Sequence, residues 1–506
     1  MKFKRLFSDS IMLKRLLTLI RDAMVYGAAG FVSPLIGFLL LPVYTHFLNP
    51  RDYGILNMVT YIPMIFSILA AAGMKSAVFQ QFHRLEDEGQ RQVALGTGLL
   101  AVLASCATLL VIGLIAAEPL ARLLLGNVGP LEVSLTRLSL CSAAIATAAE
   151  IPTAILQSRR RIKTVALLDV LQLTTTATTS VFLVVVAGWG VRGVIVGGLI
   201  GHSVDTIINL AIANRSIARR FDWGFWRTMS TYALPFLPHR LLAVGMLFFS
   251  EYMVRYLLGL EQVGLYSTAV RFALPIGFIS AAMQQAWTPY KFKIFAEDPD
   301  PAAFFRSIFT YYVAGLLYLW VGLSLWGPDL LRIMTTANFH AASSIIWAVC
   351  LMRVMQAIYP MMATGIELSD NTRAVPLTTT AGLVTALVTA VPLINAFGAL
   401  GAALATALAW GAVGVAFYFV AQRQIYIRYD LRTVFALAIV AAGFIFLGYE
   451  AQSLAGWLRL AVLVAISLLY PVLAFLILIR SETERHRMEI IRNKLVWLRR
   501  SQPSVG

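Results

Sequence analysis

Charged residues are scarce in this sequence of 506 residues, and no long polar segment is present that could form a soluble domain. Asp, Glu, Lys and Arg make up only 13% of the chain, whereas 59% is hydrophobic and the mean hydropathy is +0.76. Soluble domains are about a quarter charged. The core of a water-soluble protein with this number of residues could not bury so much apolar surface, so lipid must cover much of it. The composition excludes a soluble protein and predicts an all-α polytopic membrane protein.

Cysteine is also scarce, and the usual signatures of enzyme and cofactor sites are missing. Cys106, Cys141 and Cys350 lie far apart in apolar segments, so we expect neither disulfides nor a metal site. No Walker A sequence is present, which argues against ATP as the direct energy source. The histidines are scattered, and no pairing of a nucleophile with a base is visible. We therefore expect a protein that is not an enzyme and that carries no cofactor.

Apolar runs long enough to cross a bilayer, about 20 residues each, recur along the whole chain with short connections. We predict about 14 transmembrane helices. The turn between the eleventh and twelfth is the shortest, because only Asn395, Phe397 and Gly398 mark it. The predicted spans are 24–47, 55–79, 94–117, 131–156, 165–187, 193–214, 230–257, 263–289, 307–327, 342–364, 376–394, 398–420, 433–450 and 457–479.

Lysine and arginine are distributed unevenly between alternate loops. With residue 1 inside, the inside segments carry 30 of the 41 Lys and Arg residues, and the outside segments carry 5 when Arg459 at the start of the last span is counted with them. The positive-inside rule therefore predicts that both termini are cytoplasmic. The net charge is +16, but the basic residues lie between apolar segments rather than in one patch. We expect no nucleic acid partner.

An internal repeat divides the spans into two groups. Residues 48–57 align with residues 258–267 at an offset of 210, and Gly54 coincides with Gly264. This offset corresponds to six spans, so the halves would be parallel repeats that face each other across a central cavity. We therefore predict two six-helix lobes plus two extra helices, followed by a tail helix that lies on membrane lipids. The predicted parts are a cytoplasmic amphipathic N-terminus (1–23), an N-lobe (24–220), a C-lobe (221–425), spans 13 and 14 (426–480) and a basic cytoplasmic tail (481–506).

Several arginines lie inside predicted spans, where a charge costs about 2.5 kcal/mol or more unless it faces protein or water. Arg240, Arg271 and Arg353 each lie about ten residues into a span, hence near its middle. Carboxylates at this depth are too few to pair with all three, so the surplus positive charge predicts an anionic ligand. Arginine suits phosphate because it donates two parallel hydrogen bonds. Further candidate binding residues are Arg137, His239, Gln285 and Gln356.

Carboxylates in the spans are candidates for binding a coupling ion, H⁺ or Na⁺, although holding helices together is an equally good interpretation. Glu251 and Arg255 stand four residues apart on one helix, so we expect them to neutralise each other. The ion-coupling candidates are Asp205, Asp169, Glu150 and Glu367.

Residues 41–54, 72–77 and 261–269 contain short motifs that resemble those of Wzx-type polysaccharide transporters, which belong to the multidrug/oligosaccharidyl-lipid/polysaccharide exporter superfamily. The most recognisable motif is Glu261-Gln-Val-Gly-Leu-Tyr-Ser-Thr-Ala269 in the second half. The first half has Leu41-Pro-Val-Tyr-Thr-His-Phe-Leu48, Asn49-Pro-Arg-Asp-Tyr-Gly54 and Ala72-Gly-Met-Lys-Ser-Ala77. The resemblance in layout extends over the whole chain, whereas the motifs cover a small part of it.

This resemblance implies a flippase of the bacterial inner membrane. It would move a polyprenyl-pyrophosphate-linked oligosaccharide from the cytoplasmic to the periplasmic leaflet by alternating access, for O-antigen (lipopolysaccharide), capsule or exopolysaccharide synthesis. Arg240, Arg271 and Arg353 would then contact the pyrophosphate, and spans 13 and 14 would guide the polyprenyl tail. A polysaccharide polymerase and chain-length proteins would be partners.

Three other functions stay open on the sequence. A multidrug or organic-cation antiporter of the same superfamily would need an acidic cavity, for which Asp205 and Glu150 are candidates. A polymerase or ligase of lipid-linked sugars would need a large periplasmic loop, and none is visible. A non-transporting membrane scaffold would be expected to lack the intramembrane arginines, which are present.

Overall fold

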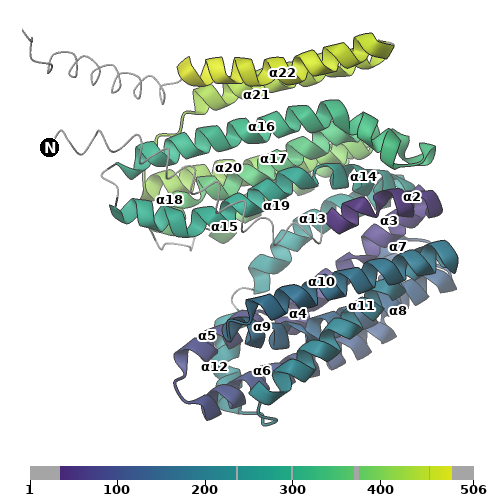
Figure 1. Cartoon of the computed structure of the whole chain (residues 1–506), viewed down its shortest axis with the longest axis vertical. Helices are drawn as coiled ribbons and strands as arrows, with labels where there is room; N and C mark the ends of the chain where they lie inside the picture. Colours follow the sequence, from purple (N-terminus) through teal and green to yellow (C-terminus); the bar gives the residue numbers. More distant parts are fainter. Residues whose placement is uncertain (1–34, 235–236, 298–299, 370–374, 455, 481–506) are drawn as a thin grey trace, which may run out of the picture.

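The computed structural model describes residues 35–234, 237–297, 300–369, 375–454 and 456–480, and this part of the chain consists of helices joined by short connections, with no strand (Figure 1). The predicted all-α fold is therefore confirmed. The predicted N-terminal helix at 1–23 and the tail at 481–506 lie outside the described residues, as does the start of the first span. The first helices are α2 (Leu41–Phe47), α3 (Pro50–Val59), α4 (Tyr61–Ala71), α5 (Met74–Arg84), α6 (Glu88–Ile115), α7 (Ala117–Leu125), α8 (Pro130–Ala148), α9 (Glu150–Ser158), α10 (Ile162–Val181) and α11 (Gly190–Ala213).

The second half continues the same architecture after a short linker. Its helices are α12 (Trp223–Ala233), α13 (Leu237–Leu258), α14 (Leu260–Phe272), α15 (Leu274–Glu297), α16 (Pro301–Met334), α17 (Ile346–Met362), α18 (Thr364–Leu368), α19 (Val375–Phe397), α20 (Ala399–Gln424), α21 (Leu431–Glu450) and α22 (Gly456–Arg480). Within the described ranges, 12 helices are long and apolar enough to cross a membrane, and α14 with α15 forms a bent thirteenth. Together with the predicted span at 24–47, this agrees with about 14 transmembrane helices.

Some predicted boundaries were wrong because backbone breaks interrupt apolar runs. The second span runs from Pro50 to Ala71 rather than over 55–79, since Ala72 and Gly73 adopt positive φ and end it. A separate helix, α5, follows. The helix of the seventh span, α13, begins at Leu237 rather than at residue 230, because α12 is a helix of its own. The closely spaced eleventh and twelfth spans are two separate helices, α19 and α20.

The helices gather into two groups that meet at one end (Figure 1). We call α2–α11 the first bundle and α13–α20 the second bundle. At the right of Figure 1, α3 lies against α14, and we call this the α3 end of the molecule. At the left, α12 packs against α5 and α6, and we call this the α12 end.

The start of α3 is determined by a local motif. Pro50 opens the helix, where its missing N–H is no loss. The Asn49 side chain accepts a hydrogen bond from the Asp52 backbone at 2.9 Å, and the Asp52 carboxylate accepts one from the Asn49 backbone at 3.3 Å. This reciprocal capping box satisfies two backbone donors at the helix start. It positions α3 at the contact between the bundles.

The last two helices are attached to the side of the second bundle. Figure 1 shows α21 and α22 lying along α16. The Trp326 indole N–H donates to the Ser467 hydroxyl at 3.0 Å, and Arg459 forms an ion pair with Asp329. These polar contacts hold α22 against α16 inside an otherwise apolar interface, where hydrogen bonds between helices add to packing.

Candidate substrate-binding site

The two bundles approach each other most closely where α3 contacts α14. A Cβ atom on Gly54 would lie 1.9 Å from the Leu260 carbonyl oxygen, and one on Gly264 would lie 1.8 Å from the Pro50 carbonyl oxygen. Only glycine permits so close an approach of two backbones. The two helices begin at Pro50 and Leu260, 210 positions apart, so the repeat-related glycines pack against each other. Backbone contact therefore joins the two bundles at the α3 end.

Side chains extend this contact between the bundles. The Thr336 hydroxyl donates to the Thr45 carbonyl oxygen at 3.1 Å, and Arg255 Nη2 donates to the Arg122 carbonyl oxygen at 2.9 Å. The expected pairing of Arg255 with Glu251 is therefore wrong. Arg255 instead links the second bundle to the last turn of α7 in the first bundle, because its long side chain reaches across the junction.

Arg271 lies in the last turn of α14, next to the 50° bend between α14 and α15. Its Nη1 donates to the Gly37 carbonyl oxygen at 3.2 Å, and its guanidinium lies 5.2 Å from the centre of the Tyr53 ring. Both partners come from the first half of the chain, and neither carries a negative charge. Among the described residues Arg271 takes part in no ion pair. Its positive charge therefore has no carboxylate partner among these residues at the junction of the bundles.

Glu251 of α13 is the carboxylate that bridges the junction. It accepts hydrogen bonds from the Asn57 amide of α3 and from the Tyr61 hydroxyl of α4. Arg353 of α17 lies within electrostatic range of the same carboxylate. One acidic side chain of the second bundle is therefore held by two polar groups of the first bundle. This polar contact joins the bundles in addition to the glycine contact.

Arg353 and Gln356 come together, as their spacing on one helix predicts. Arg353 Nη1 donates to Gln356 Oε1 at 2.7 Å, and both side chains are half-buried. The Arg353 Nε is buried and has no hydrogen-bond partner among the described residues. Since Glu251 partly balances Arg353, the surplus of positive charge is smaller than expected from three unpaired arginines.

The remaining candidate binding residues do not join this junction cluster. Arg240 is exposed and lies in the first turn of α13 rather than ten residues into its helix. The reason is that α12 takes up the residues that were assigned to the beginning of the span. His239 precedes Arg240 on α13. Arg137 of α8 and Gln285 of α15 are exposed on their helices.

Two of the ion-coupling candidates lie together within the first bundle. Asp169 of α10 and Asp205 of α11 are within electrostatic range of each other, and Lys75 is within range of Asp169. The Asn209 amide donates to the Asp205 carboxylate at 2.8 Å. These residues form a polar group in which Lys75 faces Asp169 and the Asn209 amide binds Asp205.

The other two ion-coupling candidates lie at separate places. Glu150 accepts a hydrogen bond from the Ser67 hydroxyl at 2.5 Å, inside the first bundle. Glu367 forms an ion pair with Lys291, whose side chain is 3% exposed. The charge pattern placed Lys291 in an inside loop, so nothing in the sequence indicated its burial. The contact of Glu251 with the first bundle was also missed, because Arg255 on the same helix was assigned as its partner.

The groups at the junction are suited to binding a ligand. It combines a guanidinium without a carboxylate partner, amide groups and aromatic rings, which are groups that bind anions and sugars. The described residues contain no cluster of three His, Cys, Asp or Glu side chains that could hold a metal ion. The arrangement therefore fits recognition of a polar, anionic ligand between two bundles.

The fold is similar to that of solved transporters, some of which are described as members of the MOP superfamily. The chain is similar to the lipid II flippase MurJ in an inward closed conformation, with a TM-score of 0.72 and 16% identity over 90% of this chain and 100% of that one. It is also similar to an inward-facing multidrug resistance MATE family transporter, with a TM-score of 0.64 and 14% identity over 79% and 98% of the two chains. A Pyrococcus furiosus MOP transporter, described as having a binding pocket of reverse polarity, gives a TM-score of 0.57 and 15% identity over 80% and 95%.

The sequence itself identifies the family. The profile of the polysaccharide biosynthesis protein family matches residues 19–295, which is more than half of the chain. This protein therefore belongs to the polysaccharide biosynthesis protein family, and it is a multi-pass membrane protein. The resemblance read from the short motifs is thus confirmed at the level of the family. No curated protein matches the sequence as a close relative.

Proposed function

We propose that this protein is a flippase that moves a polyprenyl-pyrophosphate-linked oligosaccharide from the cytoplasmic to the periplasmic leaflet of the bacterial inner membrane. The family and the MOP fold support a transporter rather than an enzyme. The positive-inside count supports cytoplasmic termini, which puts the α3 end on the periplasmic side. The oligosaccharide would be a building block of a cell-surface polysaccharide.

This proposal rests on the positive charge of Arg271 and on its neutral partners. Its guanidinium lies between the bundles with a carbonyl oxygen and an aromatic ring as partners. A cation held by neutral groups within a membrane protein is expected to bind an anion or to face water. A pyrophosphate has the charge and the oxygen geometry that arginine binds best. Arg353, with its unpartnered Nε, would be a second contact.

The test is to replace Arg271 and to measure transport. Arg271→Ala should lower uptake of a lipid-linked oligosaccharide into proteoliposomes about tenfold or more, because a hydrogen bond to a charged group contributes about 1.5–3 kcal/mol. Arg271→Lys should retain part of the activity, since it keeps the charge but loses the planar fork. Arg332→Ala is the matched control, because Arg332 is an exposed arginine that pairs with Asp329 on its own helix.

Normal uptake and normal polymer export by Arg271→Ala, at an unchanged amount of protein, would contradict the proposed role of this residue. The alternative, an organic-cation antiporter, predicts the opposite sign, since Arg271 repels a cation and its removal should improve binding. A deletion strain would then become sensitive to cationic drugs while surface polysaccharide stays normal. Imposing H⁺ and Na⁺ gradients in the same vesicles tests whether Asp205, Asp169, Glu150 or Glu367 couples transport to an ion.

A further inference from the structure

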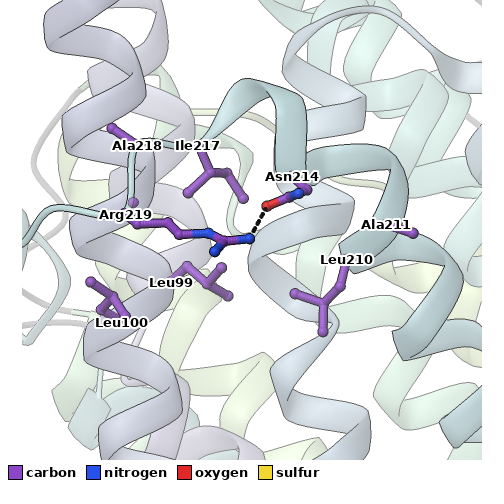
Figure 2. Close-up of a pocket in the computed structure, with 9 residues that line it drawn as sticks. Leu99, Leu100, Leu210, Ala211, Asn214, Ile217, Ala218 and Arg219 are labelled. Carbon is purple, nitrogen blue, oxygen red and sulfur yellow. Dashed lines mark hydrogen bonds between the residues drawn. The ribbon is translucent and has the colours of Figure 1, made fainter.

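A cavity of about 450 Å³ lies in the first bundle at the α12 end, away from the junction of the bundles. It lies between α6 and α11 and is bounded on one side by the linker that leads to α12 (Figure 2). Leu99, Leu210 and Ile217 form apolar walls, and Asn214 and Arg219 supply polar groups. The volume lies within the usual range of about 300–1,000 Å³ for small-molecule sites.

The linker is fixed against α6 by backbone contacts, so the cavity wall is a built part of the fold. The Ala218 N–H donates to the Gln92 carbonyl oxygen at 3.0 Å, and the Asp222 N–H donates to the Thr97 hydroxyl at 3.0 Å. A Cβ atom on Gly96 would lie 1.9 Å from the Ala218 carbonyl oxygen. The missing side chain of Gly96 therefore lets the linker cross α6 closely enough to close the cavity.

Arg219 supplies a positive charge without a carboxylate partner. Its guanidinium extends toward the Asn214 side chain across the cavity in Figure 2, and Nη2 donates to the Asn214 amide oxygen at 3.5 Å. The side chain is exposed, and in the described part of the chain it forms no ion pair. Arg220, next to it, is also exposed. The polar side of the cavity is therefore cationic.

The cavity lies on the side of the first bundle that faces away from the second bundle. Figure 1 shows α6 on the side of the first bundle that is remote from α13–α20. Leu100 and Ala211 line the cavity and are exposed, so it opens at a surface of α6 and α11 that is apolar enough to lie in lipid. Basic pockets between membrane helices bind anionic lipid head groups. This apolar cavity, with Arg219 in a basic loop beside it, has that arrangement.

We propose that this cavity binds an anionic phospholipid of the bilayer leaflet at the α12 end. An acyl chain would occupy the space between Leu99, Leu210 and Ile217, and the phosphate would accept hydrogen bonds from Arg219. The charge selects the lipid, since the cationic group of a zwitterionic lipid would lie near Arg219 and Arg220. Because the linker that forms the wall joins the two bundles, the bound lipid holds the linker in place. This site is independent of the proposed transport function.

The test is native mass spectrometry of the purified full chain during titration with phosphatidylglycerol and with phosphatidylcholine. For the tightest bound lipid, we expect the wild type to prefer phosphatidylglycerol about tenfold. Arg219→Ala should remove this preference, and Arg219→Lys should keep most of it, since one charge-assisted hydrogen bond remains. Ala211→Trp, which fills the opening of the cavity, should weaken binding of both lipids.

Arg423→Ala serves as the matched control, because Arg423 is an exposed arginine in the last turn of α20 in the second bundle. It should bind phosphatidylglycerol as the wild type does. Unchanged binding by Arg219→Ala would overturn the proposal, and so would equal affinity of the wild type for the two lipids. Stronger binding of undecaprenyl phosphate than of phosphatidylglycerol, lost in Arg219→Ala, would also overturn it, because the occupant would then be the carrier lipid.

Discussion

Replacing Gly264 by alanine tests whether the glycine contact closes the α3 end. The added methyl group would lie 1.8 Å from the Pro50 carbonyl oxygen, whereas ordinary contacts of a Cβ atom begin at 3.4 Å. The helices α3 and α14 must therefore separate by roughly 1.5 Å, the difference between these distances. Overpacking of this kind costs about 1–3 kcal/mol. We expect the equilibrium between closed and open forms of this end to shift about 5- to 150-fold toward the open form.

Cross-linking between the bundles measures this shift. A Thr45→Cys and Thr336→Cys pair, in a chain without its native cysteines, lies across the junction, where the Thr336 hydroxyl is 3.1 Å from the Thr45 carbonyl oxygen. The yield with a short bifunctional reagent should fall when Gly264→Ala is added. The thermal midpoint of the purified protein should fall as well, because the closed form loses its backbone contact.

Gly443→Ala is the matched control for this experiment. Gly443 lies within α21, and a Cβ atom on it would meet nothing within 4 Å. Its replacement should leave cross-linking unchanged and should raise helix stability by up to about 1 kcal/mol. If Gly264→Ala cross-links as well as the control and melts at the same temperature, the proposed closure by backbone contact is refuted.

Two further replacements test the charged groups of the interior. Glu251→Gln should keep the hydrogen bond from Tyr61 but remove the charge that faces Arg353, so cross-linking at the α3 end should fall severalfold while Glu261→Gln, on an exposed residue, has no effect. Glu367→Gln should lower the free energy of unfolding by about 3 kcal/mol, because it leaves the buried Lys291 without its counter-ion. Thermal melting of Glu367→Gln at the wild-type temperature would contradict the second prediction.

The membrane helices could be predicted because their signal is local. A run of about 20 apolar residues must be a helix in lipid, since every backbone polar group needs a partner within its own segment. The runs therefore predicted α19 and α20 as separate helices although only a few residues divide them. Helix ends were harder, because they depend on backbone breaks such as Ala72 and Gly73, whose positive φ no hydropathy window detects.

The candidate site could be predicted only in part. Arg353 and Gln356 share a face of one helix, and helical spacing alone brought them together. The partners of Glu251 come from α3 and α4, nearly two hundred residues earlier, so the local choice of Arg255 was wrong. Contacts between distant helices depend on how the bundles pack, and one sequence does not contain that information.

By itself, the sequence determined the all-α membrane architecture and the approximate number of spans, because apolar runs and their spacing follow directly from the chemistry of the bilayer. Tertiary structure alone decided which charges meet. It placed Gly54 against Gly264, balanced Arg353 with Glu251 and left Arg271 with neutral partners. The physical reason is that the energy of a charge depends on all groups within a few ångströms, whichever part of the chain they come from.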